Sequence, residues 1–377
     1  MIQKVLLVST MPTHPTDAGN RAAIMSQANI LKEIGCEVHF LFVSMELAHT
    51  VDYQALASYW GDRLHIFSMN ILLKMKRRLM DSWRGIVCNH YWKVDDHYPW
   101  GVAKYIKNLN EKEHFDACII QYYRLSRLIP IITIPRKAIY THDVFSYKDI
   151  RVGGHFYETV NAHEEAKALQ RCPTIFAIQN NEAIFYNMLS PKSKVYTVYN
   201  HYQIHKQPQQ NNKTILFLAS RMLFNVTGIQ CFLDKVWPLV NKEMPDVKLL
   251  VAGTVCERIT GKYENVSLLG RVDKLDDFYG RGDIVINPVY QGTGLKIKTF
   301  EALSYGKATI VHPHSMIGIY NADCAPLLCS EEPEEWLQMI RGLINEPGRV
   351  EELGRKSIEY IEGMNKYIHE QYKDFLI

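Results

Sequence analysis

Short β-branched, apolar runs alternate with segments of helical periodicity along nearly the whole chain. In the first 200 residues the expected strands lie at 4–10, 38–44, 64–69, 116–123, 137–143, 174–180 and 194–200. The same rhythm returns later, with expected strands at 214–220, 247–254, 266–270, 283–289 and 308–313. Strands that alternate with helices form parallel sheets covered by helices on both faces. The sequence therefore predicts an α/β protein with two Rossmann-like, doubly wound parallel sheets.

The polar stretch HYQIHKQPQQNNK, residues 201–213, separates the two halves. It contains a proline and has no apolar period, which is typical of a linker. The 377 residues of the chain also suit two domains. We therefore predict a first domain at 1–200 and a second domain at 214–360, facing a central cleft.

The end of the chain, residues 331–377, has a helical pattern nearly throughout. We expect one break at 346–348, where a proline and a glycine follow each other, and a second break at Gly363. The last helix, 361–377, is expected to pack back on the first domain.

The composition excludes several classes of protein. Eight cysteines are scattered singly, without a Cys-x-x-Cys pair, so we expect neither a disulfide framework nor a zinc site. No apolar run approaches the roughly 18 residues that span a bilayer. The first residues, MIQKVLLVST, lack the long apolar centre of a signal peptide. We expect a cytoplasmic protein without a nucleic-acid partner.

Positive charge is concentrated at 73–84, where Lys74, Lys76, Arg77, Arg78 and Arg84 outnumber Asp81. Leucine, methionine and tryptophan accompany these charges, so the segment has the composition of one that lies on an anionic membrane surface. A solvated helix face has the same composition. Both interpretations stay open, and the inner face of the cell membrane is a candidate location.

A glycine-rich turn stands between an expected strand and a helix in YQGTGLKIKTFEALSYGKATIV, residues 290–311. The turn comprises Gly292, Thr293, Gly294, Leu295 and Lys296. The first N–H groups of a helix are unpaired and bind anions. Arg221 ends the strand 214–220 at the same sheet edge, and a guanidinium binds phosphate in a bidentate manner. Together these features predict a pocket for a diphosphate.

Lys296 and Lys298 lie two residues apart and project from a helix in different directions. We expect Lys298 to face the phosphates, because Glu301 follows three residues later on the same face. Glu301 is expected either to accept hydrogen bonds from sugar hydroxyls or to form an ion pair with the lysine.

In the first half, Gly19 follows Asp17 in a turn ahead of a helix, where a glycine lets the backbone approach a ligand. A plain strand-to-helix turn explains the same residues. The dinucleotide-binding fingerprint G-x-G-x-x-G is absent, so we expect no dinucleotide cofactor. His142 ends the strand 137–143 and is a candidate to donate to a sugar hydroxyl, or to stabilise positive charge through its carbonyl. An ordinary polar histidine is the alternative.

The remaining histidines, His312 and His314 among them, lack the spacing of metal ligands, and no Asp-x-Asp is present. We therefore expect no metal. We also expect no cofactor.

The segment VSLLGRVDKLDDFYGRGDIVINPVYQGTGLKIKTFEALSYGKATIVHP resembles the donor-binding segment of the group 1 glycosyltransferases, family 4, which have the GT-B fold. The strand-end arginine of FLASRM and the turn at Gly19 are similar to that family in kind and order. The resemblance implies a metal-independent hexosyltransferase that moves a sugar, with retention, to an acceptor hydroxyl on a glycan or lipid-linked acceptor in polysaccharide assembly.

The resemblance also implies that the small molecule is a substrate, a nucleoside-diphosphate sugar, that the first domain binds the acceptor and the second the nucleotide sugar, and that individual residues have defined roles. Arg221 and Lys298 would bind the donor diphosphate, and Glu301 would bind the nucleotide ribose. Amides of 294–296 would face the phosphates, and His142 would face the donor sugar. His142 and Glu301 are thus the candidate catalytic residues.

Two positions depart from the family pattern. The first family glutamate is replaced by Thr293, or by Gln291 if the glycines are aligned. The second basic residue after the arginine is replaced by Phe224, Asn225 and Val226. Two alternatives therefore stay open, a nucleotide-sugar epimerase of the same fold and a nucleotide-sugar-binding protein without turnover.

Overall fold

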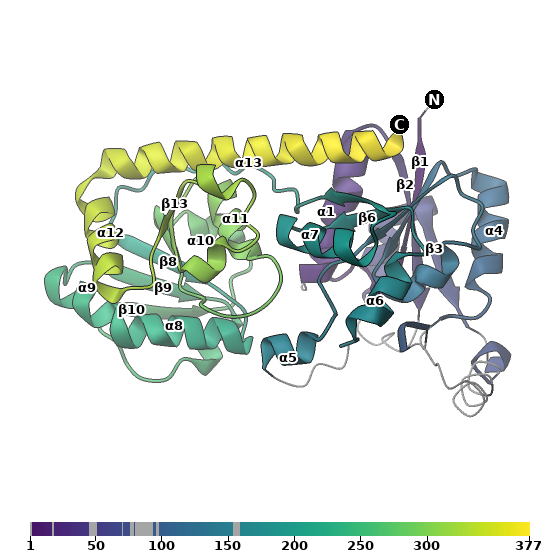
Figure 1. The fold of residues 1–377 in the computed structure, drawn as a ribbon. Helices are drawn as coiled ribbons and strands as arrows, with labels where there is room; N and C mark the ends of the chain where they lie inside the picture. The colour runs from purple at the N-terminus through teal and green to yellow at the C-terminus, as the bar shows by residue number, and fades with distance from the viewer. Residues whose placement is uncertain are drawn as a thin grey trace. The chain divides into compact units, whose positions relative to one another are not determined.

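The computed structural model describes residues 2–16, 19–44, 51–69, 71–75, 79, 93–95, 98–153 and 159–377. The chain divides into two units, which are described separately (Figure 1). Unit 1 contains Met1–His201 and Tyr367–Ile377, and unit 2 contains Tyr202–Lys366. Most of the basic segment 73–84, and Asp17, lie outside the described residues. No helix in the described ranges is both long enough and apolar enough to cross a membrane.

A parallel sheet of seven strands forms the centre of unit 1. The strands are β1 (Lys4–Ser9), β2 (Glu37–Ser44), β3 (Leu64–Ser68), β4 (Ala117–Gln121), β5 (Arg136–Tyr140), β6 (Thr174–Ala177) and β7 (Lys194–Thr197). Their order is β3-β2-β1-β4-β5-β6-β7, so the winding reverses between β1 and β4. In register, Val5 pairs with Val38 on one side and with Ala117 on the other.

Helices cover both faces of this sheet because alternate residues of its apolar strands point to opposite sides. One face packs against α4 (Val102–Glu113), α6 (Ala162–Leu169) and α7 (Asn180–Leu189). The opposite face carries α1 (Gly19–Glu33) and α2 (Tyr53–Trp60). On that face the ring of Phe40 stacks on Trp60 with centroids 5.0 Å apart. The short helix α5 (Lys148–Val152) follows β5.

Unit 2 repeats this plan with six parallel strands in the order β10-β9-β8-β11-β12-β13. The strands are β8 (Thr214–Leu218), β9 (Lys248–Ala252), β10 (Val266–Gly270), β11 (Ile284–Asn287), β12 (Ala308–Val311) and β13 (Leu327–Cys329). One face packs against α8 (Leu223–Lys235), α9 (Trp237–Glu243) and α12 (Pro333–Asn345), the other against α10 (Leu275–Tyr279) and α11 (Ile297–Ser304). The predicted pair of doubly wound sheets is confirmed, with β13 as an additional edge strand.

The last helix, α13 (Pro347–Leu376), contributes its first part to unit 2 and its end to unit 1. The break predicted at 346–348 is confirmed, since α12 ends just before it. The break predicted at Gly363 is wrong, because the helix runs through this residue. Gly363 is exposed, whereas Ile361, Met364 and Ile368 are buried at helical spacing, so packing of the apolar stripe offsets the weak helix propensity of glycine.

Candidate active site

The two segments predicted to bind the diphosphate lie at the point where the winding of unit 2 reverses. β8 and β11 are neighbours in the sheet and run parallel to each other. Arg221 follows the carboxyl end of β8, and the turn at 288–296 follows that of β11. Ligands of doubly wound sheets bind outside the carboxyl ends of the strands at such a reversal. The topology therefore places both predicted segments at the position where this architecture binds ligands.

Contacts join the two segments directly. Gly292 has a φ of 118°, and a Cβ atom added to it would lie 2.9 Å from Cδ2 of Phe224, at the start of α8. Gln291 Nε2 donates a hydrogen bond of 3.1 Å to Thr227 Oγ1. Gly228 approaches the backbone of the same turn, since its Cβ would lie 2.9 Å from Val289 Cα. Phe224, which replaces an expected basic residue, thus supports the glycine-rich turn.

The helix at this turn, α11, begins at Ile297 with Lys296 as its N-cap, directly after the predicted glycine-rich turn. No side chain caps it. The N–H of Ile297 donates to the Leu295 carbonyl. Within the described part of the chain, no hydrogen bond is found for the N–H groups of Gly294 and Leu295. These two half-buried amides are available to an anion.

Lys298 lies in the first turn of α11 and is half-buried. Burial lowers the pKa of its ammonium group from the usual 10.5, although the charge of Glu301 opposes this shift. Among the residues that the structure describes, no carboxylate lies within 4.0 Å of its Nζ, and no hydrogen bond of this group is found. A cation that has lost part of its hydration without gaining a partner binds an incoming anion favourably. Lys296 differs, since its Nζ lies 3.4 Å from the Gly294 carbonyl.

Glu301 is held by a residue that the sequence does not single out. The hydroxyl of Tyr279 donates a hydrogen bond of 2.8 Å to Glu301 Oε1, and the Tyr279 ring stacks on Tyr305 at 4.2 Å. The carboxylate is therefore oriented by a buried tyrosine rather than by an ion pair with Lys298. A tyrosine 22 residues earlier in the chain carries no sequence signal for this contact.

Arg221 lies at the predicted strand end, but a carboxylate already engages it. Its Nη1 lies 3.3 Å from Glu257 Oε2, and the arginine side chain is 62% exposed. The N–H of Arg221 donates to Thr254 Oγ1 at 2.9 Å. In the described residues no contact joins Arg221 to Lys298. A phosphate bound by Arg221 would have to share the guanidinium with Glu257, and such exposed pairs stabilise little.

His314 also reaches the glycine-rich turn, although the sequence suggests no role for it. Its Nε2 lies 3.0 Å from the Gly292 carbonyl oxygen. Burial and the charge of Lys296 lower the pKa of His314. The available signal was its place just after β12, the neighbour of β11 in the sheet.

In unit 1, a chain of hydrogen bonds fixes the ring of His142. Its Nε2 lies 2.8 Å from Gln121 Oε1, Gln121 Nε2 donates to Gln27 Oε1, and Gln27 Nε2 donates to the Tyr372 hydroxyl. Because Gln121 Oε1 can only accept, His142 carries its proton on Nε2. Burial lowers the pKa of His142 to about 3, so the ring is neutral and Nδ1 is left as an acceptor.

The same part of unit 1 contains the turn at Gly19. Gly19 is the first residue of α1, and the next residue, Asn20, donates a hydrogen bond of 3.0 Å to the Tyr122 hydroxyl. Tyr122 in turn stacks on His142 at 4.2 Å. Tyr122 and His142 both have a positive backbone φ, of 66° and 64°. Such conformations are costly for side-chain-bearing residues and cluster at functional sites. The predicted residues Gly19 and His142 therefore belong to one cluster at the β1/β4 reversal.

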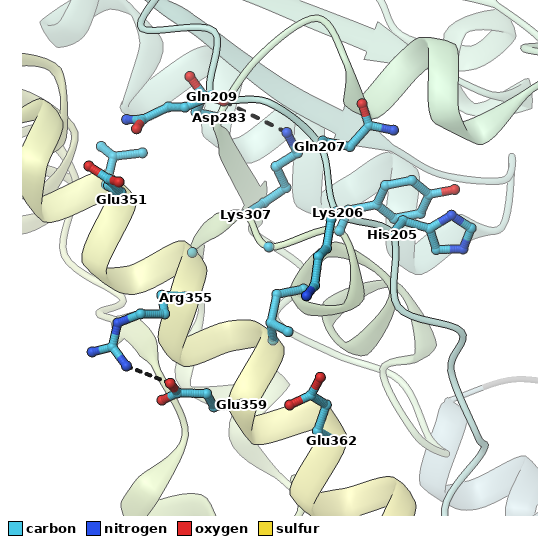
Figure 2. Close-up of a pocket in the computed structure, with 15 residues that line it drawn as sticks. His205, Lys206, Gln207, Gln209, Asp283, Lys307, Glu351, Arg355, Glu359 and Glu362 are labelled. Atoms are coloured by element: carbon cyan, nitrogen blue, oxygen red, sulfur yellow. Dashed lines mark hydrogen bonds and ion pairs between the residues drawn. The ribbon is translucent and has the colours of Figure 1, made fainter.

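A separate pocket of about 440 Å³ lies in unit 2, between the segment 205–209 and α13 (Figure 2). Asp283 and Lys307, in its wall, precede β11 and β12, so this pocket lies at the amino ends of the strands. Its charged side chains are partly paired, with Lys307 3.7 Å from Asp283 and Arg355 2.5 Å from Glu359. None of the predicted donor residues lines it. The candidate active site is therefore the opposite edge of the sheet.

The sequence of unit 2 resembles a known family. Residues 212–346 match the model of the family described as glycosyl transferases group 1. Most of unit 2 is therefore similar in sequence to the group 1 glycosyltransferases. An uncharacterized 44.6 kDa protein in the cps region of Klebsiella pneumoniae is 23% identical over 328 residues, which are 80% of either chain.

Solved structures share the fold of the whole chain at low sequence identity. TarM of S. aureus has a TM-score of 0.69 at 10% identity, covering 100% of this chain and 99% of its own. HepE of Anabaena, in complex with UDP, has a TM-score of 0.68 at 12% identity, covering 99% and 100%. The pneumococcal O-GlcNAc transferase GtfA, in complex with UDP and GlcNAc, has a TM-score of 0.63 at 10% identity, covering 100% and 99%. The predicted GT-B fold is confirmed.

The two departures from the group 1 pattern have structural consequences in this GT-B chain. Gln291 is bonded to Thr227, and Phe224 fills the space beside Gly292. Asn225 Nδ2 donates to the carbonyl and the hydroxyl of Ser220. Gln291 and Phe224 thus connect the two strand-end segments to each other, whereas Asn225 forms hydrogen bonds within the segment that follows β8.

Proposed function

We propose that this chain is a glycosyltransferase that moves a sugar from a nucleoside-diphosphate donor to an acceptor hydroxyl, with retention, during polysaccharide assembly. The family match of unit 2 and the GT-B fold support the class of reaction. The observation that carries the proposal is Lys298, a half-buried cation at the β8/β11 reversal that has no hydrogen bond or ion pair with any residue the structure describes. A leaving diphosphate gains negative charge as the glycosidic bond breaks, and a preorganised cation stabilises that charge.

The remaining positive groups support the same ligand. The amides of Gly294 and Leu295 precede α11, and Arg221 stands on the adjoining strand end. In the proposed reaction these groups replace a metal ion at the diphosphate, and Glu301, oriented by Tyr279, accepts from the ribose hydroxyls.

His142 would act as a neutral group. Its pKa of about 3 excludes an imidazolium as proton donor near neutral pH. We propose that its Nδ1 or its carbonyl faces the sugar. In a retaining reaction the departing phosphate oxygen takes the acceptor proton, so the chain needs no side chain as a strong base.

The comparisons suggest which compounds to test first. The crystal structures of HepE and GtfA hold UDP, so we propose a uridine-diphosphate sugar as donor. The relative from Klebsiella pneumoniae is placed in a cps region, and one TarM structure holds α-GlcNAc-glycerol. We therefore propose a glycan or lipid-linked glycan as acceptor.

A cytoplasmic location is part of this proposal, with the basic segment 73–84 on the inner face of the membrane. Sedimentation with vesicles tests the second point. Binding that does not depend on anionic lipid would remove the membrane from the proposal.

The direct test is a screen of nucleotide sugars against glycan acceptors, followed by release of the nucleoside diphosphate. The proposal predicts release that requires both substrates, survives a chelator, and yields a product whose anomeric configuration matches the donor. Donor epimerisation without acceptor would indicate an epimerase. Nucleotide binding without release across the screen would indicate a binding protein.

A further inference from the structure

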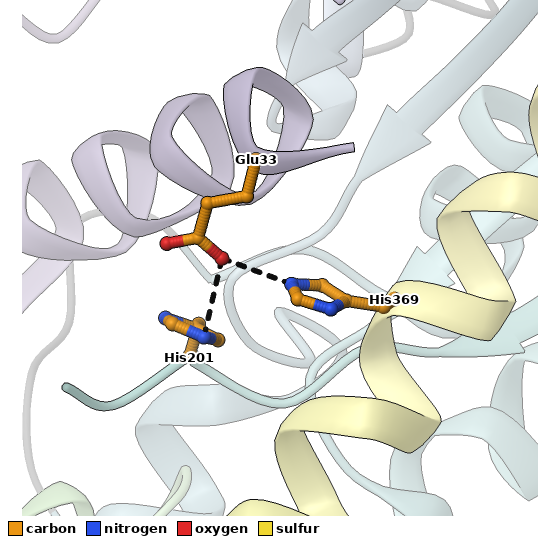
Figure 3. Close-up of side chains that lie close together, drawn as sticks. All are labelled: Glu33, His201 and His369. Carbon is orange, nitrogen blue, oxygen red and sulfur yellow. Dashed lines mark hydrogen bonds and ion pairs between the residues drawn. The ribbon is translucent and has the colours of Figure 1, made fainter. Parts of the chain in front are cut away.

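Three potential metal ligands from distant parts of the sequence meet on unit 1 (Figure 3). Glu33 is the last residue of α1, His201 lies just before unit 2 begins, and His369 lies on α13. Glu33 Oε2 is 3.0 Å from His369 Nε2 and 3.5 Å from His201 Nε2. The candidate ligand atoms all lie within 4.8 Å of one another.

These separations suit a tetrahedral metal ion. Zinc binds imidazole nitrogen and carboxylate oxygen at about 2.0–2.2 Å, which puts neighbouring ligand atoms about 3.3–3.5 Å apart. The two separations from Glu33 Oε2, 3.0 and 3.5 Å, are close to this value, and the two imidazole nitrogens lie within 4.8 Å of each other. The imidazole rings stack with an interplanar angle of 18° and centroids 5.5 Å apart, so both present Nε2 toward the same carboxylate.

The backbone on both sides of the cluster is anchored within unit 1. The N–H of His201 donates to Ser26 Oγ at 2.9 Å, and Ser26 Oγ donates to the His201 carbonyl. Three residues after His369, the buried Tyr372 accepts from Gln27 Nε2 at 2.9 Å. Both histidines are therefore held against α1 before any ion binds. Such preorganisation lowers the entropic cost of binding.

We propose that Glu33, His201 and His369 form a binding site for a divalent transition metal, with zinc as the preferred ion and water as the fourth ligand. Two imidazoles and one carboxylate with an open position are a common zinc ligand set. Glu33 is 46% exposed and His369 29% exposed, so an ion can enter from solvent. None of these residues takes part in the proposed sugar transfer, so the site goes beyond that function.

The consequence of binding follows from where the ligands lie in the chain. His201 is the last residue of unit 1 before the chain enters unit 2, and Tyr367 is the first residue after it returns. A bound ion would tie both of these segments to the end of α1. Occupancy should therefore stabilise the packing of the last turns of α13 on unit 1.

Calorimetric titration of the chelator-treated full chain with zinc chloride tests the site. We expect one ion per chain, and at least about tenfold weaker binding in Glu33→Gln and in His369→Gln. His205→Gln is the matched control, because His205 also stands beside a carboxylate, Asp276 at 3.1 Å, but belongs to no three-ligand cluster in the described residues. Its affinity for zinc should equal that of the parent.

Cobalt supplies a readout that does not depend on affinity. We expect the intense visible bands of a tetrahedral Co²⁺ ion with the parent, their loss in both ligand variants, and their displacement by zinc. Zinc should also raise the Tm of the parent but not of the variants. Absence of saturable binding by the parent, or parent-like affinity in both ligand variants, would overturn the proposal and leave the cluster as an ion pair.

Discussion

Replacing Lys298 by methionine removes a charge from the start of α11 and keeps a side chain of similar length. The ammonium group is half-buried, and within the described ranges no carboxylate lies within 4.0 Å of it. In the free protein this charge is therefore partly desolvated, and the charge of Glu301 offsets only part of that cost. We expect Lys298→Met to lower sugar transfer while leaving the free energy of unfolding unchanged or higher.

The size of the effect on catalysis follows from the role of the charge. Removing a preorganised group that stabilises developing charge costs about 2.7–4 kcal/mol, or about 10²–10³-fold in kcat. A role in ground-state binding alone would cost about 1.5–3 kcal/mol through a lost charge-assisted hydrogen bond and would appear in KM. The chemical argument for Lys298 predicts the larger loss, and in kcat.

The effect on stability has a pH dependence of known sign. The pKa of Lys298 in the folded protein lies below its usual 10.5, so above the folded pKa and up to 10.5 the unfolded chain binds more protons. Stability of the parent gains from this group as the pH rises through that window, and the variant lacks the gain. The difference in unfolding free energy between Lys298→Met and the parent should therefore shrink as the pH approaches 10.5.

Initial rates of nucleoside-diphosphate release and urea unfolding near pH 7 and pH 10 measure both effects. Lys262→Met, at an exposed lysine of the same unit, is the matched control and should alter neither. A kcat of Lys298→Met within about threefold of the parent would refute the catalytic reasoning. A loss of stability above about 1 kcal/mol would refute the description of Lys298 as a charge whose desolvation is only partly offset.

Four further changes have defined outcomes. Gly253→Ala should lower the free energy of unfolding by about 1–3 kcal/mol. The new Cβ atom would lie 2.1 Å from the Ala219 carbonyl oxygen, and the backbone φ at Gly253 is 91°. Unfolding of the variant at the same urea concentration as the parent would contradict this. Gly363→Ala should instead raise it by about 0.5–1 kcal/mol, since its Cβ meets no atom within 4 Å in a helix; a destabilised variant would show that the helix is not continuous there. Burial raises the pKa of Glu182 from 4.5 to about 8, so the free energy of unfolding should fall as the pH rises through this window. Glu182→Gln should remove that fall in urea titrations at pH 5 and 8. A variant whose unfolding free energy falls with pH as much as that of the parent would contradict the buried acid. His142→Asn should lower kcat by up to about tenfold. The pH profile of kcat between pH 5 and 8 should not change, because the ring is already neutral with a pKa of about 3. An inflection of this profile that is present in the parent and lost in the variant would mean that the ring titrates in this range.

Much of the fold could be predicted because its determinants are local. The β-branched runs before Arg221 and before the turn at 290 are strands, and their parallel pairing places both turns at one sheet edge. The continuity of α13 through Gly363 could not be predicted from the glycine itself. It depends on the buried stripe on the other side of the helix, which outweighs a cost of about 1 kcal/mol.

The site could be predicted less completely, because its contacts join residues that are remote in sequence. Glu257 engages Arg221 from 36 residues away, and Asn20 reaches Tyr122 across 102 residues. The expectation that no histidine has metal-ligand partners rested on spacing along the chain. Such spacing does not show the cluster at His369, which brings in Glu33 from 336 residues away, and the expectation of no metal stays a prediction. Linear spacing detects only ligands that share one element.

A crystal structure of the chain with UDP tests the central claim most directly. The account predicts that the β-phosphate lies within hydrogen-bond distance of Lys298 Nζ and of the amides of Gly294 and Leu295, at the carboxyl ends of β8 and β11. A nucleotide bound at the pocket beside α13, or at the proposed edge with its phosphates turned away from Lys298, would contradict it.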